Sequence, residues 1–314
     1  MLVGVDFGGT KIRAALVNNF KIKKEITVLT DVKHGKKQIL KNLFEAVDYV
    51  FDKRVSFIGV GVAGTTDGKK ILNAVNIKPL NNVKLAQIIS KRYKVPCMLE
   101  NDVNAFVIAE YLFMRQKQRK VMNVVGITLG TGVGGGLILE GKLYKGSNYS
   151  ASELGHMTIA SNRIKCSCGN YDCFEVYCNG KAIERYYYKL TNKRVSSYDV
   201  VKNYDKDLNA RKSLREYSKY LGIALVNITN IFNPEYIVIG GGISRVKQIY
   251  KPAINYLRKH ALKDSRMVKV KRSFFGKDAV VIGAAMLRKL EPKLWKEVKE
   301  KESVKEKRVR KRKK

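Results

Sequence analysis

The chain contains one local pattern twice, and this repeat limits the folds that are open to it. In the first copy, an apolar run at residues 2–6 ends in a glycine-rich turn, and a second apolar run follows at 12–17. At an offset of 122 residues, the run 121–128 leads through the glycine-rich stretch 129–136 into 137–139. Apolar runs bounded by glycines predict strands joined by turns. The repeat therefore predicts two domains that begin alike, which suits a length of 314 residues.

Strands and helices alternate after each copy of the repeat. Helical spacing of apolar residues occurs in 36–51, 85–93, 208–232 and 278–290, and strands are expected at 57–62, 96–99 and 235–239. This alternation predicts an α/β fold. The repeated glycine turns predict two domains that face one another across a cleft. We expect an N-terminal domain over residues 1–112 and a C-terminal domain over 113–291, with the last helix, about 278–291, packing back on the first.

The first glycine turn has the composition of a phosphate-binding loop. It combines glycine N–H groups that an anion can approach closely with a hydroxyl and a positive charge, in the order Gly8, Gly9, Thr10, Lys11. A plain hairpin would also use two glycines. A dinucleotide-binding fingerprint fits poorly, because a strand and not a helix follows the glycines. Together with the second turn, such a loop would grip a polyphosphate from two sides.

Two further stretches follow predicted strands. The triplet Gly240-Gly241-Gly242 would let a flat group such as adenine or ribose lie against the backbone, although a turn before a helix at 246–260 explains it equally well. Glu100-Asn101-Asp102 ends one strand and opens a helix that runs through Glu110. Asn or Asp at this position is often a helix cap. Strand ends are also where open α/β sheets place ligands.

Residues 153–175 concentrate scarce side chains. This stretch holds three of the five cysteines and one of the three histidines: His156, Cys166, Cys168 and Cys173. Three thiolates and one imidazole form a closed tetrahedral zinc site, and the intervening residues favour tight turns. The alternative is a group of unrelated thiols beside a satisfied histidine. We expect a structural zinc ion that shapes a loop flanked by Glu153 and Glu175.

The charge of the chain is strongly positive, with a formal net charge of +35. Residues 303–314 carry eight Lys and Arg against one Glu, so +28 belongs to the rest of the chain. Such a surface attracts phosphorylated small molecules and, without specificity, nucleic acid. We expect residues 292–314 to form a solvated, disordered tail, with weak nucleic-acid contact as an alternative role. The chain lacks an apolar run long enough to span a membrane, so we expect a cytoplasmic protein.

With these motifs together, the chain resembles the ROK family of sugar kinases and sugar-responsive repressors, within the actin and hexokinase superfamily. The resemblance runs from residue 2 to about 290 and is carried by five motifs in family order. They are Asp6 to Lys11, Glu100-Asn101-Asp102, Leu129 to Gly136, Glu153-Leu154-Gly155-His156, and Cys166-Ser167-Cys168-Gly169 through Glu175. It implies two ribonuclease H-like α/β domains of the actin/hexokinase type.

The resemblance also implies roles for individual residues. Asp102 matches the general base that takes the proton from a sugar hydroxyl during attack on ATP. The positions matching the sugar shell are Asn76, Asn101, Asp102, Glu153, His156 and Glu175. The nucleotide positions are Asp6, Gly8, Gly9, Thr10, Lys11, Gly130, Thr131 and Gly132, with Gly240, Gly241 and Gly242 on the adenosine side. A Mg2+ ion is expected with the phosphates.

We therefore expect an ATP-dependent kinase that phosphorylates the 6-hydroxyl of a hexose, with glucose as the first candidate. N-acetylglucosamine, N-acetylmannosamine, mannose and fructose remain alternatives, as does a non-catalytic sugar sensor that binds nucleic acid through its basic tail. The resemblance implies a homodimer or homotetramer. Three departures from the family pattern bear on these expectations. Asp172 stands where glycine usually precedes the third cysteine, the loop at residues 61–68 keeps only part of the family's pattern, and Asn76 is a weak match for the sugar-side asparagine.

Overall fold

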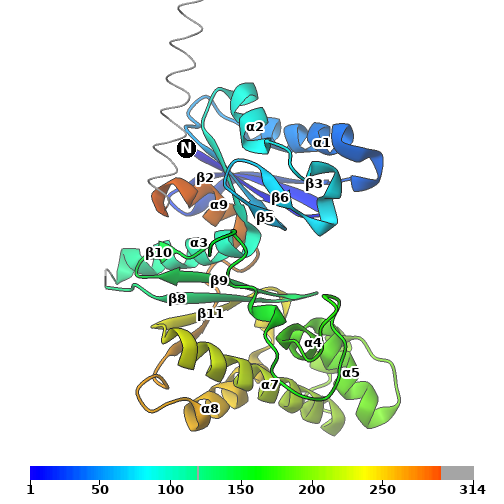
Figure 1. The fold of residues 1–314 in the computed structure, drawn as a ribbon. Helices are drawn as coiled ribbons and strands as arrows, with labels where there is room; N and C mark the ends of the chain where they lie inside the picture. The colour runs from blue at the N-terminus through cyan, green and yellow to red at the C-terminus, as the bar shows by residue number, and fades with distance from the viewer. Residues whose placement is uncertain (119, 291–314) are drawn as a thin grey trace, which may run out of the picture. The chain divides into compact units, whose positions relative to one another are not determined.

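The computed structural model describes residues 1–118 and 120–290 (Figure 1), and the predicted tail at 292–314 lies outside them. The chain divides into two compact units. Among the described residues, the first contains 1–118, 120, 141–150 and 278–290, and the second contains Val121–Glu140 and Ala151–Lys277. Residues 113–118 and 141–150, which lie beyond the expected boundary at 112 and 113, group with the first unit.

The first unit is built on a five-stranded sheet in the order β3-β2-β1-β4-β7. Its strands are β1 (Leu2–Phe7), β2 (Lys11–Asn18), β3 (Lys21–Leu29), β4 (Ile58–Val62) and β7 (Cys97–Asn101). The first three form an antiparallel meander, and β4 and β7 run parallel to β1. A small hairpin of β5 (Thr65–Thr66) and β6 (Ile71–Asn73) follows β4.

Helices lie against this sheet. They are α1 (Gly35–Val50), α2 (Leu85–Tyr93), α3 (Asp102–Lys117) and α9 (Ala279–Leu290), with the 3-10 turns η1 (Val32–His34), η2 (Val75–Leu80) and η6 (Gly276–Asp278) along the chain. The last helix packs on α3, β1 and β4, as Figure 1 shows in orange. This contact depends on glycine, because a Cβ on Gly4 or Gly59 would lie 1.8 Å from a backbone oxygen of α9.

The second unit repeats the plan of the first. Its strands are β8 (Val124–Leu129), β9 (Val133–Leu139), β11 (Tyr236–Gly240) and β12 (Lys269–Arg272), in the order β9-β8-β11-β12. The two-residue strand β10 (Lys142–Leu143) lies in the segment 141–150, which groups with the first unit. The strands β1 and β8 differ by 122 residues at both ends, so the predicted repeat is confirmed. As in the first unit, a hairpin leads and the later strands run parallel to its first strand.

The remaining helices belong to the second unit. They are α4 (Phe174–Cys178), α5 (Gly180–Thr191), α6 (Ser197–Lys202), α7 (Leu208–Phe232) and α8 (Tyr250–His260), with the 3-10 turns η3 (Leu154–His156), η4 (Gly242–Arg245) and η5 (Lys247–Ile249). Each unit has its own hydrophobic core. The predicted α/β class is therefore confirmed, with a mixed sheet in each unit.

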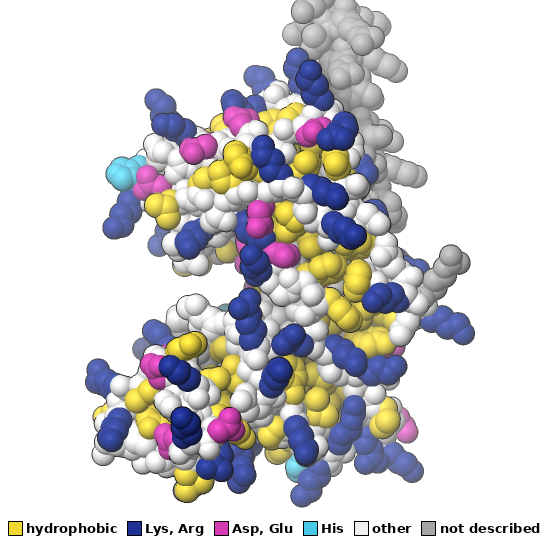
Figure 2. Space-filling view, turned by 180° about the vertical axis from the view of Figure 1, so that it is seen from behind, with side chains coloured by type: hydrophobic (Ala, Val, Ile, Leu, Met, Phe, Trp, Pro, Cys, Tyr) yellow, Lys and Arg dark blue, Asp and Glu magenta, His cyan; other side chains and the backbone are white. Residues whose placement is uncertain are grey.

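Two expected helices differ in length. The helix after Asn101 continues to Lys117 and not only to Glu110, and the helix expected at 246–260 begins at Tyr250 after two 3-10 turns. In the described part of the chain, no helix is long and apolar enough to cross a membrane. Figure 2 shows Lys and Arg side chains scattered over the whole visible face, with few Asp and Glu between them.

Candidate active site and metal centre

Three parallel strands of the first unit end at one edge of its sheet. Phe7 pairs in register with Val62, and Val62 pairs with Asn101, so β1, β4 and β7 finish at the same level. The turn after β1, the loop after β4 and the start of α3 therefore follow neighbouring strand ends. This edge brings the predicted turn at residues 8–11 near Asp102, in the position where α/β sheets bind ligands.

The turn after β1 is fixed by hydrogen bonds and by a close packing contact. The Gly8 N–H donates to the oxygen of Lys11 at 3.1 Å, and the Thr30 hydroxyl donates to the oxygen of Gly8 at 2.7 Å. A Cβ on Gly9 would lie 2.6 Å from the Cβ of Asn76, so only glycine fits here. The structure thus places Asn76 directly beside the turn, while Thr10 and Lys11 are exposed.

Asp6 lies near the end of β1 and carries an unusual charge environment. Burial raises the pKa of its carboxyl to about 6, although the positive charge of Arg13 acts in the opposite direction. Arg13 itself is held by ion pairs with Glu25 and Asp278. The ionised carboxylate of Asp6 is therefore costly in the folded protein, which suits a group that receives a cation in function.

Asn101 and Asp102 join the end of β7 to α3. The side-chain oxygen of Asn101 accepts hydrogen bonds from the N–H groups of Val103 and Asn104 at 2.9 and 3.1 Å, so the helix-cap interpretation is confirmed for this residue. Its amide nitrogen donates to the oxygen of Gly64 at 3.2 Å. Asp102 is the first helical residue, and its carboxylate accepts from the Val103 N–H at 2.9 Å.

A buried ion pair supports this junction, and no local sequence pattern predicts it. Glu100 is 3% exposed, and its carboxylate binds the Lys145 ammonium at 2.8 Å. The same carboxylate accepts from the Asn101 N–H at 2.9 Å and from the Asn104 amide at 3.0 Å. A glutamate inside a buried strand signals that some cation must pair with it, but not which one.

In the second unit, the two glycine segments lie side by side. Thr128 pairs with Gly240, so β8 and β11 end at the same edge. Gly241 has a φ of 80°, and a Cβ there would lie 2.2 Å from the oxygen of Leu129. The residues predicted to bind the nucleotide in this unit are thus brought together: Gly130, Thr131 and Gly132 on one side, Gly240, Gly241 and Gly242 on the other.

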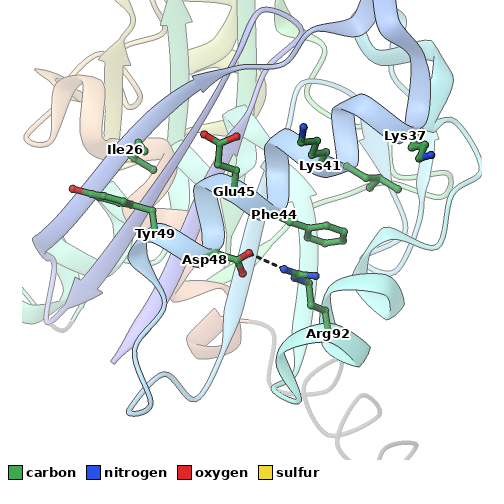
Figure 3. A pocket seen from close by; sticks show the side chains of 9 residues that line it. Ile26, Lys37, Lys41, Phe44, Glu45, Asp48, Tyr49 and Arg92 are labelled. Carbon is green, nitrogen blue, oxygen red and sulfur yellow. Dashed lines mark hydrogen bonds and ion pairs between the residues drawn. The ribbon is translucent and has the colours of Figure 1, made fainter.

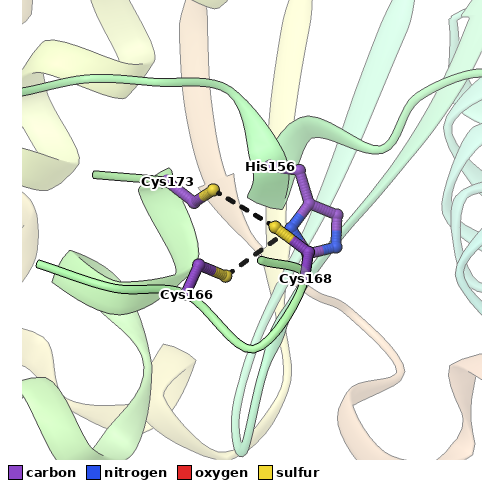
Figure 4. A group of neighbouring side chains, drawn as sticks. All are labelled: His156, Cys166, Cys168 and Cys173. Atoms are coloured by element: carbon purple, nitrogen blue, oxygen red, sulfur yellow. Dashed lines mark hydrogen bonds between the residues drawn. The ribbon is translucent and has the colours of Figure 1, made fainter. Parts of the chain in front are cut away.

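The four predicted zinc ligands converge on one point (Figure 4). The ligand atoms of His156, Cys166, Cys168 and Cys173 all lie within 4.8 Å of one another. The sulfur atoms of Cys168 and Cys173 are 3.7 Å apart, close to the roughly 3.8 Å expected between two thiolates on a tetrahedral Zn2+ with bonds of about 2.3 Å. The Nδ1 atom of His156 faces the sulfurs, at 3.9 Å from that of Cys166.

The chemistry of the thiols also fits a cation. A hydrogen bond from the Asn170 N–H lowers the pKa of Cys168 to about 7, so its thiolate is accessible near neutral pH. Burial raises the pKa of Cys173 to about 12, so metal binding there must displace a proton. These four residues could hold a structural metal ion with a closed shell.

The loop at residues 153–175, here called the metal loop, begins and ends with a glutamate, and these two glutamates differ in exposure and in hydrogen bonding. Glu153 is exposed and precedes η3, which packs on β9 so closely that a Cβ on Gly155 would lie 2.0 Å from the oxygen of Val133. Glu175 accepts a hydrogen bond from the Val133 N–H at 3.0 Å. Its other oxygen lies 3.8 Å from the Cys166 sulfur. Glu175 thus connects the metal loop with the turn that follows β8.

A hollow on the first unit lies away from all predicted site residues. It has a volume of about 810 Å³ and is bordered by α1, β3 and the end of α2 (Figure 3). Two of its charged groups pair with each other, because Arg92 binds Asp48 at 2.7 Å and stacks over Phe44 at 4.6 Å. None of its lining residues is among those predicted for the site, so we place the candidate site at the strand ends.

The chain is similar to proteins named as sugar kinases. The chain is 31% identical over 304 residues to N-acetyl-D-glucosamine kinase of Histophilus somni (strain 129Pt), which covers 91% of this chain and 98% of that protein. It is 33% identical over 270 residues to glucokinase of Thermotoga maritima, covering 79% and 84%.

The fold is similar to the crystal structure of a ROK family glucokinase from Streptomyces griseus in complex with glucose and AMPPNP. The TM-score is 0.76 at 28% identity, and the match covers 91% of this chain and 98% of that one. The model of the ROK family matches residues 2–291. The resemblance carried by the five sequence motifs is thereby confirmed, and the chain belongs to the ROK family.

Proposed function

We propose that this protein is an ATP-dependent hexose kinase that transfers the γ-phosphate to the 6-hydroxyl of its sugar. The observation that carries this proposal is the position of Asp102 at the N-terminus of α3, at the sheet edge that also holds the turn at residues 8–11. A carboxylate at this edge can accept a proton from an attacking alcohol. Family membership agrees with such a reaction.

In the proposed reaction, the sugar oxygen attacks the γ-phosphorus and its proton passes to Asp102. The bond between that phosphorus and the bridging oxygen breaks, and ADP leaves. Phosphoryl transfer needs alignment and charge neutralisation more than covalent help. Backbone N–H groups of the glycine turns and the Lys11 ammonium supply donors and positive charge for the phosphates. We assign the other sugar hydroxyls to Asn76, Asn101, Glu153, His156 and Glu175.

Two metal ions fit the residues present. The carboxylate of Asp6 is a hard oxygen ligand whose burial leaves it in need of positive charge, and it would hold the Mg2+ that accompanies the nucleotide. His156 and the three cysteines would hold a structural Zn2+, which braces the loop from residue 153 to 175. Removal of zinc with a chelator should release about one metal per chain and raise the KM for the hexose.

Glucose is the first substrate we propose, and N-acetylglucosamine is the second candidate. The second is favoured by a specific observation, because a relative named N-acetyl-D-glucosamine kinase matches over 98% of its own length. The two sugars differ only at the 2-position, where an acetamido group replaces a hydroxyl. The kinase mechanism is the same for both.

A coupled assay of ADP release, run over a panel of hexoses and amino sugars with several nucleotide donors, tests this function. We expect sugar-dependent release with ATP, and a kcat/KM that is highest for glucose. A higher value for N-acetylglucosamine would select the second candidate. If no sugar in the panel stimulates ADP release, the proposal is refuted.

A further inference from the structure

Asp172, the residue before the metal ligand Cys173, is the most highly bonded side chain of the metal loop. It has a left-handed φ of 59° and is 4% exposed. Its carboxylate accepts hydrogen bonds from the N–H groups of Arg163 and Ile164 at 2.8 and 3.0 Å, and from the Tyr177 hydroxyl. A buried carboxylate is tolerated only where donors satisfy it, and here three donors do so.

The backbone of Asp172 ties together the same parts of the chain. Its N–H donates to the oxygen of Ile164 at 2.8 Å, and its oxygen accepts from the Ile159 N–H at 3.0 Å. Isolated bridges on either side, between Thr158 and Cys173 and between Lys165 and Tyr171, continue this pairing. One residue thus fixes the arm that leads from His156 to Cys166 against the segment that carries Cys173.

A second layer anchors this arrangement in the core of the unit. The Asn162 amide donates to the hydroxyls of Tyr177 and Tyr220 at 3.2 and 3.0 Å. The two tyrosine rings pack with centroids 4.2 Å apart, and Tyr177 is 1% exposed. The carboxylate of Asp172 is therefore connected through rigid, buried side chains of α4 and α7 to the body of the unit.

We propose that Asp172 is a positioning residue that preorganises the metal loop. The affinity of the loop for Zn2+, and the positions of the proposed sugar ligands on the same loop, then depend on the carboxylate of Asp172. This inference rests on the proposed zinc centre. The aspartate side chain accepts three hydrogen bonds that a glycine at this left-handed position could not accept. A loop ordered before binding loses less conformational entropy when the ion binds, and the affinity rises accordingly.

Alternative explanations predict different behaviour. If aspartate merely tolerates a left-handed backbone here, glycine should replace it without loss, because glycine adopts this φ more readily. If the carboxylate positions the loop, glycine leaves two N–H groups and one hydroxyl without their acceptor. Partners outside the ligand shell typically change metal affinity by about 10–100-fold when they are removed.

The test uses the full chain and three variants: Asp172→Gly, Asp172→Asn and Tyr177→Phe. Affinity for Zn2+ is measured by competition with a chromogenic chelator, and Co2+ substitution reports the geometry of the thiolate shell by its absorption spectrum.

We expect Asp172→Gly to weaken Zn2+ binding by about 10–100-fold. Asparagine keeps one acceptor oxygen but presents an N–H group to Arg163, and Tyr177→Phe removes one donor, so both should give smaller losses. The KM for the hexose should rise with each, and kcat should change little.

Asp31→Gly is the matched control, because Asp31 has a φ of 57° and lies in the first unit. Zn2+ affinity of Asp172→Gly equal to that of this control would overturn the proposal. If Asp172→Gly does not fold, Tyr177→Phe decides: a loss of Zn2+ affinity supports the proposal, and an unchanged affinity overturns it. A wild-type protein that binds no Zn2+ also overturns it. Because Zn2+ binding is measured without turnover, an inactive protein that binds Zn2+ tightly would contradict only the kinase function.

Discussion

Asp6 shows how a buried carboxylate at the candidate site can weaken the fold that carries it. Burial raises its pKa to about 6 from a value near 3.8. The folded protein therefore binds more protons than the unfolded chain between these values, and stability falls as pH rises through this window. Below pH 3.8, the pKa of Asp6 in the unfolded chain, the folded protein has lost none of this stability. Two pKa units correspond to at most about 3 kcal/mol.

We predict that Asp6→Asn removes this pH dependence. At pH 8 the variant should be more stable than the wild type by up to about 3 kcal/mol, because the amide has no charge to desolvate. Near pH 4 the difference should vanish. Chemical denaturation at a series of pH values measures it. A variant that is less stable at pH 8 would show that the ionised form is stabilised by the fold.

Lys145 is the second residue whose role can be tested alone. Lys145→Met leaves the buried carboxylate of Glu100 without its cation, which typically costs about 3–5 kcal/mol. We also expect a lower kcat, because Glu100 orients the backbone of Asn101 and the amide of Asn104 next to Asp102. The matched control is the double variant Glu100→Gln with Lys145→Met, which removes both charges. In a denaturant titration, the double variant should recover most of the stability that Lys145→Met alone loses. A double variant as unstable as Lys145→Met would contradict the ion pair between Glu100 and Lys145.

For single residues, the sequence predicts a role where the partners of the residue lie close to it along the chain. The cysteines and His156 are recognisable because scarce ligand types cluster, and Asn101 because a cap follows a strand. The roles of Lys145 and Asp172 could not be read in the same way. Their partners lie 45 residues away in one case, and in the other include backbone N–H groups whose direction depends on the folded loop.

At the scale of elements, glycines decide how closely neighbouring pieces pack. The turn η3 carries His156 and lies on β9, where a side chain at Gly155 would collide with the oxygen of Val133 at 2.0 Å. Backbone cannot move aside as a flexible side chain can. The position of the metal loop therefore depends on the absence of a Cβ at this residue.

We predict that Gly155→Ala shifts η3 away from β9. It should destabilise the second unit by about 1–3 kcal/mol through overpacking, and weaken both Zn2+ and hexose binding by about tenfold. Gly180→Ala is the control, because its Cβ would find no atom closer than 3.7 Å. Thermal unfolding and equilibrium binding of the two variants give the comparison. Equal behaviour of both would show that the close approach has no consequence.

Element prediction succeeded where the pattern is long and failed where it is short. The 25 residues of α7 and the repeated hairpins carry enough apolar periodicity to fix type and place. The strands β5, β6 and β10 have two or three residues and no period to detect, and α4 has five. These short elements are stabilised by tertiary contacts, and a local sequence pattern does not encode such contacts.

For the whole molecule, the sequence predicts the repeated architecture but not the course of the chain between the units. Residues 141–150 return to the first unit although they lie between segments of the second. No composition change marks either crossing. The last helix differs from this segment, because it is expected to pack back on the first domain. In the structure, the backbone oxygens of Val281 and Ala284 lie against Gly4 and Gly59 of the first sheet.

The net charge allows a prediction for the whole protein. A body with about +28 should attract a polyphosphate nucleotide over long range, and salt should screen this attraction. We expect the KM for ATP to rise several-fold between about 0.05 and 0.3 M salt, while the KM for the uncharged hexose stays constant. A variant ending at residue 290 should keep this slope. Equal salt dependence for both substrates would point to a general effect of salt on the enzyme.

The general base is the centre of the proposed function, and Asp102→Asn tests it most directly. Single-turnover phosphorylation of the preferred hexose, together with calorimetric binding of that sugar, separates chemistry from affinity. A general base at residue 102 predicts a rate at least about a hundredfold slower, with the sugar Kd nearly unchanged. A rate within threefold of the wild type would contradict it.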